Sequence, residues 1–223
     1  MFHGLDLDIA HLLAGSLVLV SFMLLYQGRL LGVINIFAFH AWVLAAAVAW
    51  QAFIQGAPHL YITAAIALLF KGAFIPYVFH RLVRRMGLHR QIETVVGIGL
   101  TMLLGVALVA LSIVIILKAT RNTELLLLAR EDVAFALSVV LLGLLMMVTR
   151  RNAVSQVIGF MSLENGLILA ATGAKGMPLV VEISIAFSVL IAIIVIGIFL
   201  FRIRERFDTV DVEVLDTYRG EKP

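Results

Sequence analysis

Seven runs of about twenty apolar residues follow one another along the chain, and they constrain its fold more than any other feature. A helix satisfies its own backbone N–H and C=O groups inside hydrocarbon, and it needs roughly 20 residues to cross a bilayer. The strands of a membrane barrel alternate and are much shorter. The runs cover about residues 9–27, 30–53, 60–82, 94–117, 131–149, 152–173 and 178–201. The sequence therefore predicts an all-α polytopic membrane protein with seven transmembrane helices in one domain, residues 1–203, followed by a cytoplasmic tail, residues 204–223.

The composition excludes several classes of protein. Hydrophobic residues make up 62% of the chain and charged residues 14%, against roughly 45–50% and 25% in soluble domains. The absence of cysteine removes disulfides, thiolate nucleophiles and iron–sulfur ligation. No phosphate loop, nucleophile elbow or HExxH spacing is present. We expect neither a catalytic centre nor a cofactor in this chain, and no nucleic-acid partner, because the arginines cluster at the ends of the apolar runs.

The basic residues predict the orientation in the membrane. One set of connections carries most of the arginine, and cytoplasmic loops are enriched in Lys and Arg. Asp6 and Asp8 precede the first run without a basic flank or a small-residue cleavage pattern, so we expect this run to remain as a helix. The N-terminus is therefore predicted outside and the C-terminus inside. The cytoplasmic set comprises Arg29, Arg81, Arg84, Arg85, Arg90, Arg150, Arg151, Arg202, Arg204 and Arg206.

A parallel repeat is a further expectation. Spans one to three and spans five to seven run in the same directions, with the fourth span joining them. Arginine follows the first helix of each triple. Glycines inside the runs, including Gly99, Gly159 and Gly166, predict close packing between helices.

Two opposite charges stand in the middle of predicted spans. Lys71 lies in the third span, within LLFKGAFIP, and Glu164 lies in the sixth, within RRNAVSQVIGFMSLENG. A charge near the bilayer centre costs at least ~2.5–3.5 kcal/mol on insertion scales. Similar depth and opposite sign favour pairing, either as a structural ion pair or as a station in a proton relay.

Other polar residues in the spans are weaker relay candidates. Glu182 is shallower, near the external start of the seventh span, and His40 lies in the middle of the second. Imidazole titrates near neutrality, although a hydrogen-bonded structural role is the simpler interpretation of His40 and of His11 in the first span. No second histidine at matching depth supports a haem. Pro76 removes a backbone hydrogen bond and is predicted to kink helix three.

These motifs carry a family resemblance. RRNAVSQVIGFMSLENG, then LVVEISIAFSVLIAIIVIGIFLF and a tail with FDTVDVEVL resemble component E of the hydrogenase 4 and formate hydrogenlyase complexes, and FKGAFIP looks like that family's lysine-containing segment. The likeness covers essentially the whole chain. The last three helices are also similar to the small three-helix subunit shared by complex I and Mrp-type sodium/proton antiporters.

The resemblance implies a membrane-arm subunit of a group 4 hydrogenase-type respiratory complex in a bacterial or archaeal cytoplasmic membrane. It implies antiporter-like and complex I-like membrane partners, and a peripheral hydrogenase or dehydrogenase arm that holds the nickel–iron and iron–sulfur centres. Glu164 then corresponds to the main intramembrane carboxylate. Two departures stand out. The small complex I subunit would place its first glutamate at Met161, one helical turn earlier, and component E relatives carry an acid near Ser188.

The implied mechanism is ion translocation coupled to electron transfer. Movement of Lys71 toward or away from Glu164 would change the protonation of the carboxylate. The residues leave H⁺ and Na⁺ open as the ion. Two alternatives also stay open, namely a non-conducting structural scaffold of the same complex and a subunit of an Mrp-type antiporter.

Overall fold

The computed structural model describes residues 2–85, 95–120 and 127–173, and this part of the chain is helical with no strand. It contains six helices that are long and apolar enough to cross a membrane: Leu5–Tyr26, Leu30–Gln55, Pro58–Arg84, Ile98–Ala119, Glu131–Thr149 and Ala153–Gly173. They agree closely with the first six predicted spans and confirm an all-α polytopic architecture. The seventh predicted span, 178–201, and the tail, 204–223, lie outside the described residues. The count of seven helices and the repeat that depends on it therefore stay predictions.

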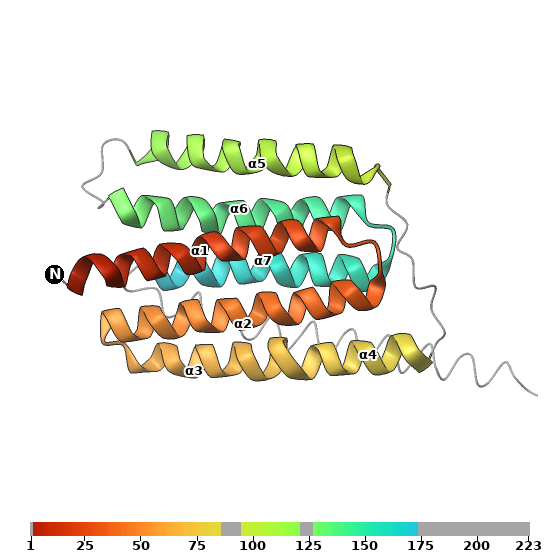
Figure 1. The fold of residues 1–223 in the computed structure, drawn as a ribbon, viewed down its shortest axis with the longest axis horizontal. Helices are drawn as coiled ribbons and strands as arrows, with labels where there is room; N and C mark the ends of the chain where they lie inside the picture. The colour runs from red at the N-terminus through yellow and green to blue at the C-terminus, as the bar shows by residue number, and fades with distance from the viewer. Residues whose placement is uncertain (1, 86–94, 121–126, 174–223) are drawn as a thin grey trace, which may run out of the picture. The chain divides into compact units, whose positions relative to one another are not determined.

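The helices lie lengthwise beside one another (Figure 1). The elements are α1 (Phe2–Tyr26), α2 (Leu30–Gln55), α3 (Pro58–Ile66), η1 (Ala67–Phe74), α4 (Ile75–Arg85), α5 (Ile98–Ala119), α6 (Leu127–Thr149) and α7 (Ala153–Gly173). Together α3, η1 and α4 form the third membrane helix, in which η1 is π-helical. The α1 helix packs against α2, α5 and α6, while α2 packs against α7 and the third helix. Buried apolar side chains fill the space between α1, α2, α6 and α7.

The sharp connection between α2 and α3 follows from its sequence. Gly56 adopts a left-handed conformation, with φ of +62°, which glycine reaches at little steric cost. The amide of Ala57 then bonds to the carbonyl of Ala52, which closes the end of α2. Pro58 opens α3 at a position where a missing N–H costs nothing. The third helix is thereby turned back against α2, which brings Lys71 toward the interior.

Glycine sets the spacing between α6 and α7. A β-carbon on Gly143 would lie 2.6 Å from the backbone nitrogen of Leu163, and one on Gly166 would lie 2.8 Å from that of Val140. Gly159 faces the carbonyl of Gly143 in the same way. The expectation of close packing is confirmed for Gly159 and Gly166.

Gly99 differs, because no described residue lies within 4 Å of the position of its β-carbon. Gly99 is exposed near the start of α5. The α5 helix is the least buried of the six spans, and most of its large apolar side chains face outward. That surface suits hydrocarbon, so a glycine there needs no helix beside it.

Candidate functional site

Lys71 and Glu164 form an ion pair in the interior of the described helices. The ammonium Nζ of Lys71 lies 3.1 Å from Oε2 of Glu164. The two side chains are 3% and 4% exposed, so water can screen their charges very little. Lys71 comes from η1 and Glu164 from the middle of α7. The pairing that similar depth and opposite charge favoured in the sequence is present, and it converts two costly buried charges into one neutral unit.

A line of hydrogen bonds extends from this pair across two more helices. Nζ of Lys71 lies 2.9 Å from Oδ1 of Asn165, whose Nδ2 lies 3.0 Å from Nδ1 of His40 on α2. Nε2 of His40 lies 3.0 Å from the hydroxyl of Ser21 on α1. All five side chains are buried. We call Glu164, Lys71, Asn165, His40 and Ser21 the buried polar chain.

The donors and acceptors of the buried polar chain run in one direction. The ammonium can only donate, so it fixes the carbonyl oxygen of Asn165 toward Lys71 and the amide N–H toward His40. Nδ1 of His40 then accepts, which leaves the single proton of a neutral imidazole on Nε2. The hydroxyl oxygen of Ser21 accepts a hydrogen bond from this N–H, and the hydroxyl donates to the carbonyl of Leu17, 2.9 Å away. His40 is therefore a neutral, fully hydrogen-bonded residue in this arrangement.

The backbone around Lys71 departs from the regular α form. The π-helical segment η1 is 8 residues long and contains Lys71 and Gly72. Pro76, at the start of α4, has no N–H to donate to the carbonyl of Gly72 four residues earlier. The indole of Trp42 donates to that carbonyl instead, at 3.1 Å. The disruption predicted at Pro76 thus coincides with a π-helical turn that begins before it. Such turns are frequent at functional sites, and the predicted kink itself stays a prediction.

The RRN motif holds the helices that frame the site. Arg150 is 1% exposed, and its guanidinium donates to the carbonyls of Leu24, Leu25 and Gln27 at 3.3, 2.5 and 3.0 Å. These carbonyls lie at the end of α1, where backbone acceptors lack helical partners. Asn152 accepts the amide of Val154 at 2.9 Å and so caps the start of α7. One short connection therefore fixes the end of α1 and the beginning of α7.

The residues predicted from the sequence divide into three groups. Lys71, Glu164 and His40 lie together in the buried polar chain. Glu182 and Ser188 lie outside the described residues. His11 lies elsewhere on α1, where it contacts acidic residues of α6.

Sequence reasoning missed Asn165 and Ser21 as members of the buried polar chain. Asn165 follows Glu164 directly within the ENG motif, and that adjacency was the available signal. The sequence gives no signal for Ser21, because serine is common in membrane helices. The glycine of the same motif, Gly166, brings α7 close to α6.

The fold and the site define a polytopic helical membrane protein whose interior holds the buried polar chain, including the ion pair of Lys71 and Glu164. Within the described ranges, no cluster of three or more His, Asp or Glu residues is placed to hold a metal ion. No family model matches the chain, and no solved structure matches it.

Curated relatives match the chain over nearly its whole length. Hydrogenase-4 component E of Escherichia coli K12 is 28% identical over 212 residues, which cover 93% of this chain and 96% of the relative. The uncharacterised protein Rv0085 of Mycobacterium tuberculosis is 29% identical over 210 residues, which cover 92% and 94%. The family resemblance is thereby confirmed: the chain is a homologue of hydrogenase-4 component E.

Proposed function

We propose that this chain is a membrane subunit of a hydrogenase complex of the group 4 type, and that it contributes to ion movement coupled to electron transfer. The contribution to ion movement is supported by the Lys71–Glu164 pair, which is almost completely buried in the middle of two membrane spans. Ionisable groups at that depth are costly, and in membrane proteins they mark ion pathways by default.

The pair can change its proton content through a small movement of Lys71. With Nζ at 3.1 Å, the ammonium stabilises the charged carboxylate of Glu164. If Lys71 moves away, the carboxylate of Glu164 loses the stabilisation that the ammonium gives to its charge in a low-dielectric interior, which favours the uptake of a proton. Asn165 offers the ammonium a second acceptor at 2.9 Å, so part of its coordination is retained during such a movement. A charge change in a neighbouring subunit would supply the driving force.

His40 has a subordinate place in this mechanism. Its Nδ1 accepts from Asn165, so it takes up a proton only after that hydrogen bond has broken. Glu164 is therefore the principal relay group, Lys71 modulates its charge, and His40 holds the far end of Asn165 in position.

The partners in this proposal are antiporter-like and complex I-like membrane subunits and a peripheral hydrogenase or dehydrogenase arm. The match over nearly the full length of component E supports this assignment. It favours the hydrogenase complex over an Mrp-type antiporter, whose related subunit has only three helices. The ion is H⁺ or Na⁺.

The test is Glu164→Gln in the assembled complex. Glutamine keeps the volume and most hydrogen bonds but cannot titrate. Incorporation of the subunit is followed on native gels, and the uptake of H⁺ and Na⁺ into vesicles is compared at matched electron-transfer rate. We expect normal incorporation and a loss of about tenfold or more in ion uptake per electron. Lys71→Ala should lower uptake through the same pair, so the two effects should not add.

Asp8→Asn is the matched control, because it removes an exposed carboxylate near the start of α1. It should change neither incorporation nor ion uptake. Normal incorporation with normal uptake in Glu164→Gln would refute the relay and leave the scaffold function. Lost incorporation, restored when both residues of the pair are replaced by apolar ones, would instead identify a structural ion pair.

A further inference from the structure

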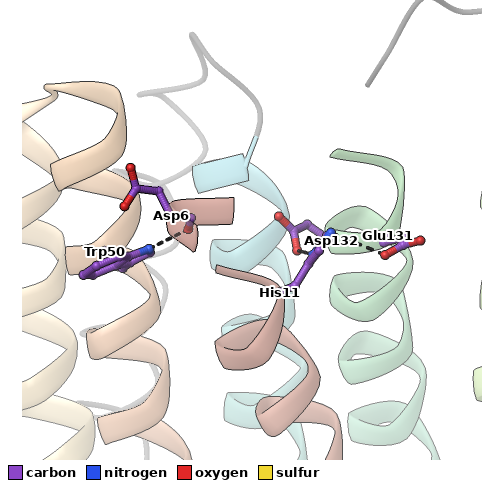
Figure 2. Close-up of polar contacts among 5 residues, drawn as sticks. All are labelled: Asp6, His11, Trp50, Glu131 and Asp132. Atoms are coloured by element: carbon purple, nitrogen blue, oxygen red, sulfur yellow. Dashed lines mark hydrogen bonds and ion pairs between the residues drawn. The ribbon is translucent and has the colours of Figure 1, made fainter. Parts of the chain in front are cut away.

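A second group of titratable side chains joins α1 to α6. His11 of α1 stands between two consecutive acidic residues of α6 (Figure 2). Its Nδ1 lies 2.6 Å from Oδ1 of Asp132, and its Nε2 lies 3.3 Å from Oε2 of Glu131. His11 and Asp132 are 15% and 16% exposed, whereas Glu131 is 57% exposed. We call these three residues the histidine clamp.

The charges of the histidine clamp favour a bound proton. Nδ1 of His11 is hydrogen-bonded to Asp132, whereas Nε2 lies 3.3 Å from Oε2 of Glu131 without the alignment of a hydrogen bond. Ionised carboxylates only accept hydrogen bonds, so a neutral imidazole donates its single N–H to Asp132 and leaves the lone pair of Nε2 beside Glu131. An imidazolium replaces this lone pair with an N–H, and both carboxylates attract its positive charge. The 2.6 Å separation from Asp132 is short, as in charge-assisted hydrogen bonds.

The groups around His11 on α1 and α6 are aromatic or acidic. Phe135, one turn along α6 from Asp132, contacts the His11 ring edge-on with centroids 6.4 Å apart, which fixes the plane of the ring. On α1 itself, Asp6 and Asp8 add only negative charge nearby, and the Asp6 carbonyl accepts a hydrogen bond from the Trp50 indole of α2 at 2.8 Å (Figure 2).

Two cations on neighbouring helices do not pair with the clamp. Lys118 at the end of α5 and His59 at the start of α3 are exposed. Among the described residues, neither makes an ion pair with the clamp. The negative surroundings therefore favour a proton on His11.

We propose that His11, Glu131 and Asp132 form a proton-binding site at the end of the membrane domain where α1 and α6 begin, and that the bound proton ties these two helices together. The ligand is a proton from the aqueous phase on that side, which reaches the site past the exposed carboxylate of Glu131. With the proton, the clamp carries one net negative charge and two attractive contacts. Without it, the neutral imidazole keeps one hydrogen bond, its other nitrogen directs a lone pair toward the remaining carboxylate, and the contact between the helices weakens.

This site is separate from the buried polar chain. Along α1, ten residues separate His11 from Ser21, which corresponds to about 15 Å of helix. Among the described residues, no hydrogen bond or ion pair joins the two groups. The test of the proton-binding site is therefore independent of the test of the proposed relay at Glu164.

The test is ¹⁵N NMR of the histidines in the full-length chain in lipid nanodiscs. The chain has six histidines, and loss of one signal in His11→Gln assigns the residue. We expect both ring nitrogens of His11 to be protonated at about pH 8, where an unperturbed imidazole is neutral. A neutral His11 at that pH overturns the proposal.

Two further variants test the cause. In Glu131→Gln/Asp132→Asn the histidine stays but the two charges are lost, so the imidazolium signal at about pH 8 should disappear. If it persists, the carboxylates do not hold the proton and the proposal fails. Glu131→Gln alone, at an exposed position, puts the fold at least risk and should weaken the same signal.

Discussion

Asn165 is the central link of the buried polar chain. It has no charge, yet its amide connects a buried ammonium to a buried imidazole. Each buried polar group left without a partner costs about 1–3 kcal/mol, and more for a charged group. One uncharged side chain therefore determines whether Lys71 and His40 keep their places.

The variant Asn165→Leu tests that role. Leucine has a similar shape but offers neither an acceptor to Lys71 nor a donor to His40. We expect a loss of about 1–3 kcal/mol or more, measured as a lower unfolding temperature in detergent or nanodiscs. Asn35→Leu is the matched control, because Asn35 is exposed on α2. Equal unfolding temperatures for the two variants would contradict the connecting role of Asn165.

The sequence identifies the charged members of the site more readily than the uncharged ones. Lys71 and Glu164 were predictable because charges in apolar spans are rare and costly. Asn165 and Ser21 were not, because a polar neutral residue is tolerated on any face of a membrane helix. Their roles follow only from the contacts between four helices, which no spacing within one helix encodes.

At the level of elements, the third helix illustrates what periodicity cannot predict. Proline at position 76 predicts a disturbance at the preceding turn. The structure spreads this disturbance over the 8 residues of η1, which include Lys71. Within η1 the carbonyl of Gly72 accepts a hydrogen bond from Trp42, which lies on another helix. A single-helix pattern contains no information about that donor.

The contact between α6 and α7 allows a direct test with alanine. Gly143→Ala would place a methyl group 2.6 Å from a backbone nitrogen of α7, so the helices must separate. We expect a loss of about 1–3 kcal/mol, seen as a lower unfolding temperature. Gly99→Ala meets no described residue within 4 Å and should be neutral or stabilising, since alanine favours helix. Similar unfolding temperatures for both variants would show that α6 and α7 are not so close.

For the whole molecule, the orientation in the membrane is the main untested expectation. The arginine-rich connections predict that Arg84 lies inside and that Lys118 lies outside. The chain contains no cysteine, so Arg84→Cys and Lys118→Cys each introduce a single label. In intact cells an impermeant thiol reagent should modify the second variant and not the first until the membrane is opened. Labelling of Arg84→Cys from outside would reverse the predicted topology.

The pairing of Lys71 with residues of α7 has a consequence for biosynthesis. Lys71 and its acceptor Asn165 are 94 positions apart in the chain. A ribosome that works from the N-terminus therefore delivers the ammonium long before either of its partners exists. During that interval the third helix carries an unpaired charge, which opposes its release into lipid. The insertion machinery must retain this helix until α7 arrives, and a chain truncated before Glu164 becomes a natural substrate for membrane proteases.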